Sequence, residues 1–162
     1  MVFRTLARLV GRRDRLEDLA QEVFLRLWRG LAHFRGEAQV GTYLYRIVVN
    51  VAQEEWKRRK RRQVEVSLND PDTSWEERLA AAGPSVTDVL TTTALKAEVE
   101  AALLTLSDSE RAALVLFHQE DRTYQEVAGI LGLPLNTVRT YLHRGRERLR
   151  RAVREKMGEA GS

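Results

Sequence analysis

The segment from residue 123 to residue 156 constrains the fold more than any other part of this chain, because it combines two helix signals with a short turn. Thr123 and Glu126 form a capping box, a pattern with which helices commonly begin. Gly132 follows that first helix and can adopt the positive φ that a tight turn requires. A second, longer helix then starts near Asn136. Two helices with this spacing predict a helix-turn-helix.

The second helix of this motif predicts a contact with duplex DNA. In a helix-turn-helix, the second helix lies in the major groove and its first turns reach the base edges. Arg139, Thr140 and His143 project from one side of it; Arg139 suits two hydrogen bonds to a guanine, and Thr140 suits a thymine methyl group or a phosphate. Arginines farther along suit phosphates, which position a protein without specifying sequence: Arg144, Arg146 and Arg148. The alternative is a basic, solvated helix end, or a surface for RNA or a membrane.

The rest of the chain also has helical periodicity, and no stretch alternates in the manner of a strand. The other expected helices cover residues 2–10, 15–33, 43–62 and 108–119, and periodicity also resumes at residues 95–103. Between residues 63 and 95 the periodicity fades, and Asn-Asp-Pro-Asp, Gly-Pro and several serines and threonines predict a linker with one helical turn around residues 75–81. Together these patterns predict an all-α protein.

Charge divides the chain in similar places. Residues 1–66 have a net charge of +7, residues 67–95 of −4 and residues 96–162 of +1, with +6 concentrated between residues 136 and 157. Two basic helical parts therefore flank an acidic middle, which predicts two anionic contacts. We expect two small helical domains, 1–66 and 96–162, joined by a flexible linker, 67–95.

Composition excludes several classes of protein. The chain has no cysteine, which removes disulfides, cysteine-based zinc sites and a cysteine nucleophile, and suits a reducing cytosol. No apolar run approaches the roughly 18 residues that a membrane span needs, and residues 1–13 lack the pattern of a signal peptide. We therefore expect a cytoplasmic protein without membrane insertion.

Enzymatic chemistry also finds little support. The three histidines are isolated in the sequence, and no metalloprotease, P-loop or nucleophile-elbow motif is present. The acidic pairs Glu54-Glu55 and Glu120-Asp121 are expected to be solvated helix ends. We expect no metal, no cofactor and no catalytic residue.

The helix expected at residues 15–33 is more apolar than a small bundle requires. Its apolar side chains cover well over half of the helical wheel, whereas a core-facing stripe needs little more than about 100°. The extra row, Phe24, Leu25 and Trp28, is expected to face a partner. The alternative is that the helices at residues 2–10 and 43–62 bury the whole surface.

The helix expected at residues 43–62 changes character along its length. Tyr43, Tyr45 and Trp56 are aromatic, whereas residues 57–62 are a run of lysines and arginines. Aromatic and basic side chains on one element are typical of single-stranded nucleic-acid sites, where bases stack or flip into a pocket. The alternative, favoured for Tyr45, is that the aromatic residues belong to the core and the basic run is solvated.

These two halves resemble a known family. The segments DLAQEVFLRLW, FRGEA, TYLYRIVVNVA and RRKRR, in this order, resemble region two of an extracytoplasmic-function (ECF) sigma factor. The segments LLTLSDSERAALVL and TYQEVAGILGLPLNTVRTYLHRGRERLRRAV resemble region four. A helix-turn-helix alone would be weak evidence, but the pair in the right order, with a linker of the right length, is specific.

The resemblance implies a promoter-specificity subunit of bacterial RNA polymerase that is not itself an enzyme. Region two of such proteins docks on the clamp helices of core polymerase and melts the minus-ten promoter element. Region four binds the minus-thirty-five element as duplex DNA and contacts the polymerase flap. The acidic linker is then expected to thread the RNA exit path, and an anti-sigma factor is expected to cover both polymerase-binding faces.

The resemblance also implies roles for individual residues. The polymerase clamp would be contacted by Asp18, Gln21, Glu22, Leu25 and Trp28. A flipped minus-ten base would be held by Phe34, Arg35, Gly36, Glu37, Ala38, Gln39 and Asn50, and the promoter backbone by Arg58, Arg59, Arg61 and Arg62. The minus-thirty-five element would be contacted by Asn136, Thr137, Arg139, Thr140, His143, Arg144 and Arg146.

The chain departs from the family pattern at a few positions. Tyr43 stands where a Trp is usual, and Glu54 where an Asp is usual. Asn136 replaces a glycine and can still cap a helix, whereas Gly145 replaces an alanine at an expected cost of up to about 1 kcal/mol in helix stability. The first helix is also shorter than in most members, so the N-terminus is expected to be trimmed.

Two other functions stay open at this point. A stand-alone helix-turn-helix regulator would need only the C-terminal half; residues 15–62 argue against it, because a simple repressor has no use for an apolar helix followed by an aromatic and basic one. A gel-shift assay separates the two, since a repressor binds duplex DNA tightly without polymerase. The other alternative, a nuclease or phosphotransferase, lacks a recognisable motif.

Overall fold

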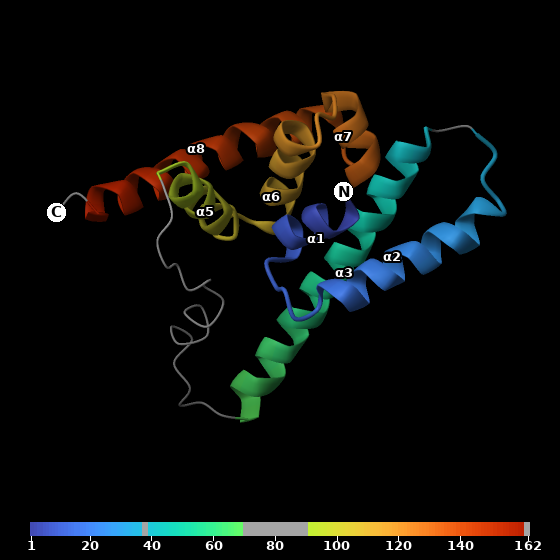
Figure 1. Cartoon of the computed structure of the whole chain (residues 1–162), viewed down its shortest axis with the longest axis horizontal. Helices are drawn as coiled ribbons and strands as arrows, with labels where there is room; N and C mark the ends of the chain where they lie inside the picture. Colours follow the sequence, from blue (N-terminus) through green and yellow to red (C-terminus); the bar gives the residue numbers. More distant parts are fainter. Residues whose placement is uncertain (37–38, 70–90, 161–162) are drawn as a thin grey trace.

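The computed structural model describes residues 1–36, 39–69 and 91–160, and these residues fold almost entirely into helices (Figure 1). Their order is α1 (Val2–Val10), α2 (Leu16–Leu31), α3 (Val40–Asn69), α5 (Thr91–Leu103), α6 (Asp108–Leu114) with its π-helical continuation η1 (Val115–Gln119), α7 (Tyr124–Leu131) and α8 (Leu135–Ala160). The predicted all-α fold is confirmed for this part of the chain. The helical turn predicted around residues 75–81 lies outside the described residues.

Helices α1, α2 and α3 form the first bundle. Leu6 and Leu9 of α1, Val23 of α2 and Val48 of α3 are fully buried in a shared core. Gly11 ends α1 with a φ of 70°, and its N–H bonds back into the last turn of that helix. The chain can therefore reverse within a few residues and bring α2 against α1.

Helix α3 is about 45 Å long, because it has 30 residues and an α-helix rises about 1.5 Å per residue. Its first half lies against α1, α2 and α7, and its last turns extend away from the rest of the molecule (Figure 1). The Trp56 ring is buried, and its indole N–H donates to the carbonyl of Leu9 at 3.1 Å. The basic run at residues 57–62 begins directly after this ring, and Nζ of Lys60 still lies 3.4 Å from Oδ2 of Asp108 in α6.

The predicted bounds of this helix need correction. It begins at Val40 rather than after Thr42, and it continues to Asn69, so the predicted linker, 67–95, starts inside a helix. Lysine, arginine and glutamine have good helix propensity, which lets the helix continue after its apolar stripe has ended. Residues 70–90, the remainder of that linker up to α5, lie outside the described residues.

Helices α5, α6, α7 and α8 form the second bundle. Thr123 and Glu126 make the predicted capping box at the start of α7, and Gly132 ends α7 with a φ of 65°. The predicted helix-turn-helix is thereby confirmed. Helix α8 packs on α6 at Gly145, where an added Cβ would lie 2.9 Å from Cδ1 of Leu114. The glycine that weakens α8 as an isolated helix therefore permits this close approach.

The two bundles pack against each other, an arrangement that the sequence did not predict. Their buried apolar side chains form one continuous cluster. Helix α7 lies on the first half of α3, and α1 lies against α6 and η1 (Figure 1). Tyr45 and Trp56 of α3 are both buried, which confirms the alternative that these aromatic residues belong to the core.

The acidic pairs predicted to be solvated are solvated only in part. Glu54 and Asp121 are exposed, but Glu55 and Glu120 are only 3% and 6% exposed. Glu55 pairs with Arg58 in the first bundle, and Glu120 accepts hydrogen bonds from the other bundle. The prediction was wrong for these two residues, because sequence position alone does not show which carboxylate the tertiary structure buries.

Candidate functional site

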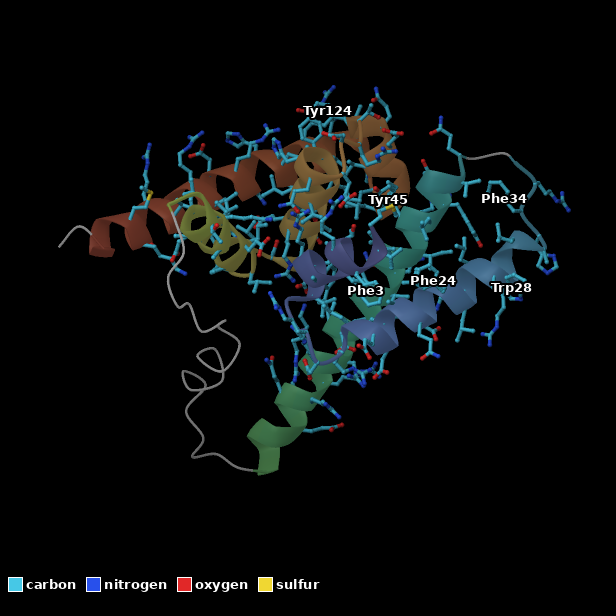
Figure 2. All side chains as sticks on the ribbon, in the orientation of Figure 1. Phe3, Phe24, Trp28, Phe34, Tyr45 and Tyr124 are labelled. Atoms are coloured by element: carbon cyan, nitrogen blue, oxygen red, sulfur yellow. The ribbon has the colours of Figure 1, made fainter. Side chains whose placement is uncertain are left out.

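A row of apolar side chains on α2 has little cover from the rest of the described structure. Trp28 is 77% exposed and Phe24 is 50% exposed, whereas Val23 is buried. Figure 2 labels both aromatic side chains on α2. Helices α1 and α3 cover only one face of α2, so the alternative in which they bury its whole apolar surface is wrong. Clustered exposed aromatic side chains are typical of a protein-binding surface. The name α2 apolar surface is used below for Phe24, Leu25, Trp28 and Leu31.

The polar residues predicted beside this surface differ in whether they have partners within the chain. Asp18 and Gln21 are exposed. Glu22 accepts a hydrogen bond from Nε of Arg26 at 2.6 Å, and Arg26 makes two further bonds to the carboxylate of Glu54, at 2.8 and 2.7 Å. These bonds from Arg26 lower the pKa of Glu54. The residue that replaces the usual Asp therefore helps to tie α3 to α2.

The loop between α2 and α3 is organised around Tyr43. The Tyr43 ring lies 5.5 Å from that of Phe34, measured between centroids. Its hydroxyl occupies the space that a Cβ on Gly30 would fill, so this glycine lets the ring lie across the end of α2. Of the other residues predicted to line a base pocket, Arg35, Gly36 and Gln39 are exposed, and Glu37 and Ala38 lie outside the described residues.

Asn50 belongs to the same face of α3 as Tyr43. It is exposed and lies seven residues farther on, which is two helical turns or about 10 Å along the axis. Arg46 is exposed between them. The described members of the predicted pocket therefore form a strip that runs from the end of α2 along α3.

The four arginines predicted to hold promoter backbone fall into two pairs. Arg61 and Arg62 are exposed. Nε of Arg58 lies 3.1 Å from the buried carboxylate of Glu55. Arg59 is half-buried, and this burial lowers its pKa. Arg61 and Arg62 are therefore the more accessible pair for a DNA backbone.

Helix α8 presents the predicted DNA-contacting side chains to solvent. Val138 and Leu142 are buried and fix the helix against the bundle. The neighbouring positions that face outward are Asn136, Arg139, Thr140, His143 and Arg144, and Thr137 is half-buried. The name reading face is used below for Arg139, Thr140, His143 and Arg144.

Two other arginines of α8 have partners within the second bundle. The guanidinium of Arg146 lies 5.5 Å from the centroid of the Phe117 ring, and its Nε donates to Nε2 of His118 at 3.1 Å. Burial and the nearby Arg146 lower the pKa of His118, so the imidazole stays neutral and can accept. Arg148 pairs with the buried carboxylate of Glu110 at 3.1 Å. The sequence assigned both arginines to phosphates, and in the structure each has a partner within the second bundle.

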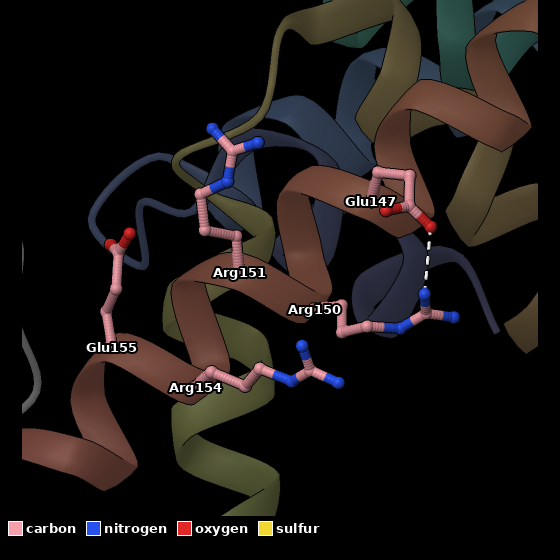
Figure 3. A pocket seen from close by; sticks show the side chains of 5 residues that line it. All are labelled: Glu147, Arg150, Arg151, Arg154 and Glu155. Atoms are coloured by element: carbon pink, nitrogen blue, oxygen red, sulfur yellow. Dashed lines mark hydrogen bonds and ion pairs between the residues drawn. The ribbon is translucent and has the colours of Figure 1, made fainter.

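The far half of α8 carries a feature that sequence reasoning did not single out. Five charged side chains line a shallow, open groove of about 270 Å³ (Figure 3): Glu147, Arg150, Arg151, Arg154 and Glu155. Arg150 donates to Glu147 at 2.9 Å. The spacing of three and four residues between these charges is the signal that could have revealed it. One helix alone lines the groove, which therefore has no enclosed space for a small molecule.

Two kinds of feature, a cluster of metal-ligating side chains and a membrane-spanning helix, were sought among the described residues. No three His, Cys, Asp or Glu side chains among the described residues gather in a way that could hold a metal ion. No helix there combines the length and apolar character needed to cross a bilayer.

Comparison with known proteins identifies both bundles. The Sigma-70 region 2 family matches residues 1–62, and the Sigma-70, region 4 family matches residues 96–149. The chain is 36% identical over 152 residues to the ECF RNA polymerase sigma factor SigE of Mycolicibacterium smegmatis, and spans 92% of its own length but 56% of that protein. It is 30% identical over 166 residues to the ECF RNA polymerase sigma-E factor of Haemophilus influenzae, spanning 94% of this chain and 81% of that protein.

The fold agrees with these matches. The sigma factor RpoE of Bartonella quintana, solved in complex with the anti-sigma factor NepR, superposes with a TM-score of 0.71 at 22% identity, over 94% of this chain and 89% of that one. The two bundles are thus the region-two and region-four domains of a sigma-70-type transcription initiation protein. Within that class, the chain belongs to the ECF RNA polymerase sigma factors.

Proposed function

We propose that this chain directs bacterial core RNA polymerase to promoters, with residues 1–66 as region two, 67–95 as the connection and 96–162 as region four. One observation supports this most: the chain exposes both the α2 apolar surface and the reading face of α8. A regulator that only binds duplex DNA would need the second surface and not the first. The chain would act as a binding subunit in the cytoplasm, with no catalytic residue of its own.

The α2 apolar surface is the proposed contact with the polymerase clamp. Trp28 and Leu25 would be covered by the partner, and Asp18 and Gln21 would form a polar rim. Glu22 would contribute mainly by holding Arg26. Interfaces with an aromatic centre and a polar rim have this composition.

The minus-ten element is proposed to lie along the strip from the loop at residues 34–39 to Asn50. Single-stranded bases can stack on Tyr43 or Phe34, and an exposed asparagine can donate and accept on a base edge. Arg61 and Arg62 would hold the backbone. Arg58 would join them only by leaving Glu55, and the half-buried Arg59 only by turning outward.

The minus-thirty-five element is proposed to bind as duplex DNA on the reading face. Arg139 would read a guanine and Arg144 would hold a phosphate, with Asn136 and Thr137 at the start of the helix close to the DNA backbone. Arg146 would contribute to this contact only by leaving Phe117 and His118. These assignments follow from exposure and from position on the helix.

An anti-sigma factor is proposed as a regulator of this chain. The solved relative RpoE of Bartonella quintana is bound to the anti-sigma factor NepR. On this chain, the α2 apolar surface offers an inhibitor the same apolar side chains that polymerase would need. An inhibitor bound there would exclude polymerase by direct competition.

The test is co-elution of the pure chain with bacterial core RNA polymerase, followed by run-off transcription from a pool of promoters. We expect a stable complex and initiation from a subset of templates that share two elements. Tight and specific binding to duplex DNA without polymerase, together with no co-elution, would contradict the proposal and favour a stand-alone regulator.

A further inference from the structure

One arginine in the middle of α8 makes two contacts with η1. The guanidinium of Arg146 lies 5.5 Å from the centroid of the Phe117 ring, and its Nε donates to Nε2 of His118 at 3.1 Å. Both partners belong to η1, which precedes the helix-turn-helix in the chain. A hydrogen bond and a cation–π contact together fix both the direction and the distance of this side chain.

The Phe117 ring also contacts the other helix of the helix-turn-helix. Tyr124, the first residue of α7 (Figure 2), stacks on it, with centroids 4.8 Å apart and ring planes 17° from parallel. His118 meets the same ring at an edge, with centroids 4.9 Å apart and an angle of 89° between the planes. Both α7 and α8 are therefore joined to η1 through one ring. We call Phe117, His118, Tyr124 and Arg146 the η1 cluster.

The π-helical turn supports these contacts from the core. Its five residues continue α6, and the N–H of Glu120 bonds to the carbonyl of Val115, five residues earlier, at 3.1 Å. Val115 and Leu116 are fully buried, whereas Phe117 is half-buried and His118 is exposed. Single π-helical turns are rare and are frequently found at functional sites. The first two side chains thus anchor the turn in the core, and the next two are available to α7 and α8.

Arg146 lies at the border between the buried side of α8 and its reading face. It follows Arg139 by seven residues, so the two share one side of the helix, about 10 Å apart along the axis. Val138 and Leu142, on the adjoining side, are buried in the core. A contact at this border limits the rotation of α8 about its own axis. That rotation decides where Arg139 and its neighbours on the reading face point.

A phosphate contact and a positioning role for Arg146 have different consequences. A bond to a phosphate strengthens binding to every DNA sequence alike and adds about 0.9 to the salt slope, which is the slope of log K against log salt. A contact that only orients the reading face strengthens binding to matched bases and leaves that slope unchanged. Nε of Arg146 is already used by His118, whose imidazole is neutral because burial and Arg146 lower its pKa. The structure therefore favours the positioning role.

We propose that Arg146 is a positioning residue of region four, which holds α8 against Phe117 and His118 and thereby directs the reading face toward the bases of the minus-thirty-five element. The proposal rests on the proposed function, because it requires that α8 reads promoter DNA. The contact within the η1 cluster is a property of the free chain, so it can be measured without DNA or polymerase.

The experiment compares one labelled promoter duplex with a copy whose minus-thirty-five element is scrambled. The duplex is taken from the templates that the parent chain selects in the run-off pool. Binding of the full chain, reconstituted with core polymerase, is measured by fluorescence anisotropy between about 50 and 200 mM salt. Two quantities result: the salt slope, and the specificity ratio, which is the Kd for the scrambled duplex divided by the Kd for the matched one.

We expect Arg146→Ala to lower the specificity ratio by about threefold to tenfold and to leave the salt slope unchanged, because it removes one hydrogen bond and one cation–π contact. Arg144→Ala is the matched control for a phosphate ligand; it should reduce the slope by about 0.9 and leave the ratio unchanged. Arg154→Ala removes an exposed arginine farther along α8 and should change neither quantity.

His118→Ala tests the other side of the contact without endangering the fold, because His118 is exposed. It should lower the specificity ratio by a smaller factor, since Phe117 still contacts Arg146. In the His118→Ala background, Arg146→Ala should have a smaller effect than in the parent, because residues of one network are not additive. In the free chain, NMR titration should show that Arg146→Ala raises the pKa of His118 toward its usual value near 6.5.

Three outcomes would overturn the positioning role. One is an unchanged specificity ratio in Arg146→Ala, and a salt slope that falls by about 0.9 in that variant would then identify a phosphate ligand. Another is a pKa of His118 that Arg146→Ala leaves unchanged, which would show that the contact is absent in solution. The third is a shifted pKa in a chain that binds no promoter DNA with or without polymerase; that result would confirm the contact and contradict the proposed function as well.

Discussion

Replacing Trp28 by alanine should separate binding from folding. A tryptophan side chain offers up to about 250 Å² of surface, and Trp28 is 77% exposed, so about 190 Å² remains for a partner to cover. At about 25 cal/mol per Å², covering that area is worth up to about 5 kcal/mol. Fixing the side chain in one conformation on binding costs about 1 kcal/mol of this free energy. The structure therefore predicts that Trp28→Ala weakens binding to core polymerase by about 2 to 4 kcal/mol, the usual range of an interfacial hot spot.

The loss corresponds to about 30-fold to 900-fold in Kd, measured by fluorescence anisotropy of a labelled chain titrated with core polymerase. Urea unfolding of the same variant should change by no more than about 0.5 kcal/mol, because the ring contributes little to the core. Met157→Ala is the matched control, since Met157 is 61% exposed on α8, away from the α2 apolar surface. Trp56→Ala is the opposite case and should destabilise the fold by about 3 to 5 kcal/mol.

Two results would refute this reasoning. Unchanged polymerase binding by Trp28→Ala would show that the α2 apolar surface is not the docking site. A loss of more than about 1 kcal/mol of folding stability would show that the ring is covered in solution, contrary to its exposure in the structure. Either result is distinguishable from a general failure of the assay, because Met157→Ala must bind as the parent does.

Three further predictions concern α8 and the contact between bundles. Arg139→Ala should weaken promoter binding by about 1 to 3 kcal/mol through one base position, whereas Arg144→Ala should weaken binding to all promoters alike and reduce its salt dependence. Run-off assays on base-substituted templates should tell the two variants apart. Identical profiles would contradict the assignment of Arg139 to a base and Arg144 to a phosphate. Gly145→Val should lower the free energy of unfolding by about 1 to 3 kcal/mol, because its side chain would collide with Leu114; a variant as stable as the parent in urea would disprove the close approach. Burial and the bond to Glu120 raise the pKa of Tyr45 to about 12, whereas an unfolded tyrosine ionises near 10, so the stability from this group is complete below about pH 10 and is lost as pH rises toward about 12. Unfolding at stepped pH should show that loss in the parent and not in Tyr45→Phe.

Local sequence signals predicted most of the individual helices. The Thr123 capping box and Gly132 fixed the bounds of α7 because caps satisfy backbone groups within a few residues. The exposed apolar row on α2 could also be predicted. A helix at the edge of a small bundle buries one face, so apolar side chains beyond that face stay exposed. The end of α3 was misplaced because basic residues continue a helix after its apolar stripe has ended.

Charged residues were the hardest to assign to a role. Arg146 and Arg148 have the position of phosphate ligands, but the structure pairs them with His118 and Glu110. Glu55 was expected at a solvated helix end and is buried beside Arg58. A charged side chain is long and can reach several neighbours, so its partner depends on which elements pack nearby rather than on its own helix.

The sequence by itself determined the all-α class, the two-part organisation and the faces that each helix offers, because propensity, capping and periodicity act over a few turns. Only the tertiary structure decided how the two parts meet. Glu120, Thr5 and Tyr45 are far apart along the chain, and nothing local marks them as partners. A buried carboxylate is stabilised by hydrogen-bond donors that tertiary packing brings to it, and no local sequence pattern encodes that contact.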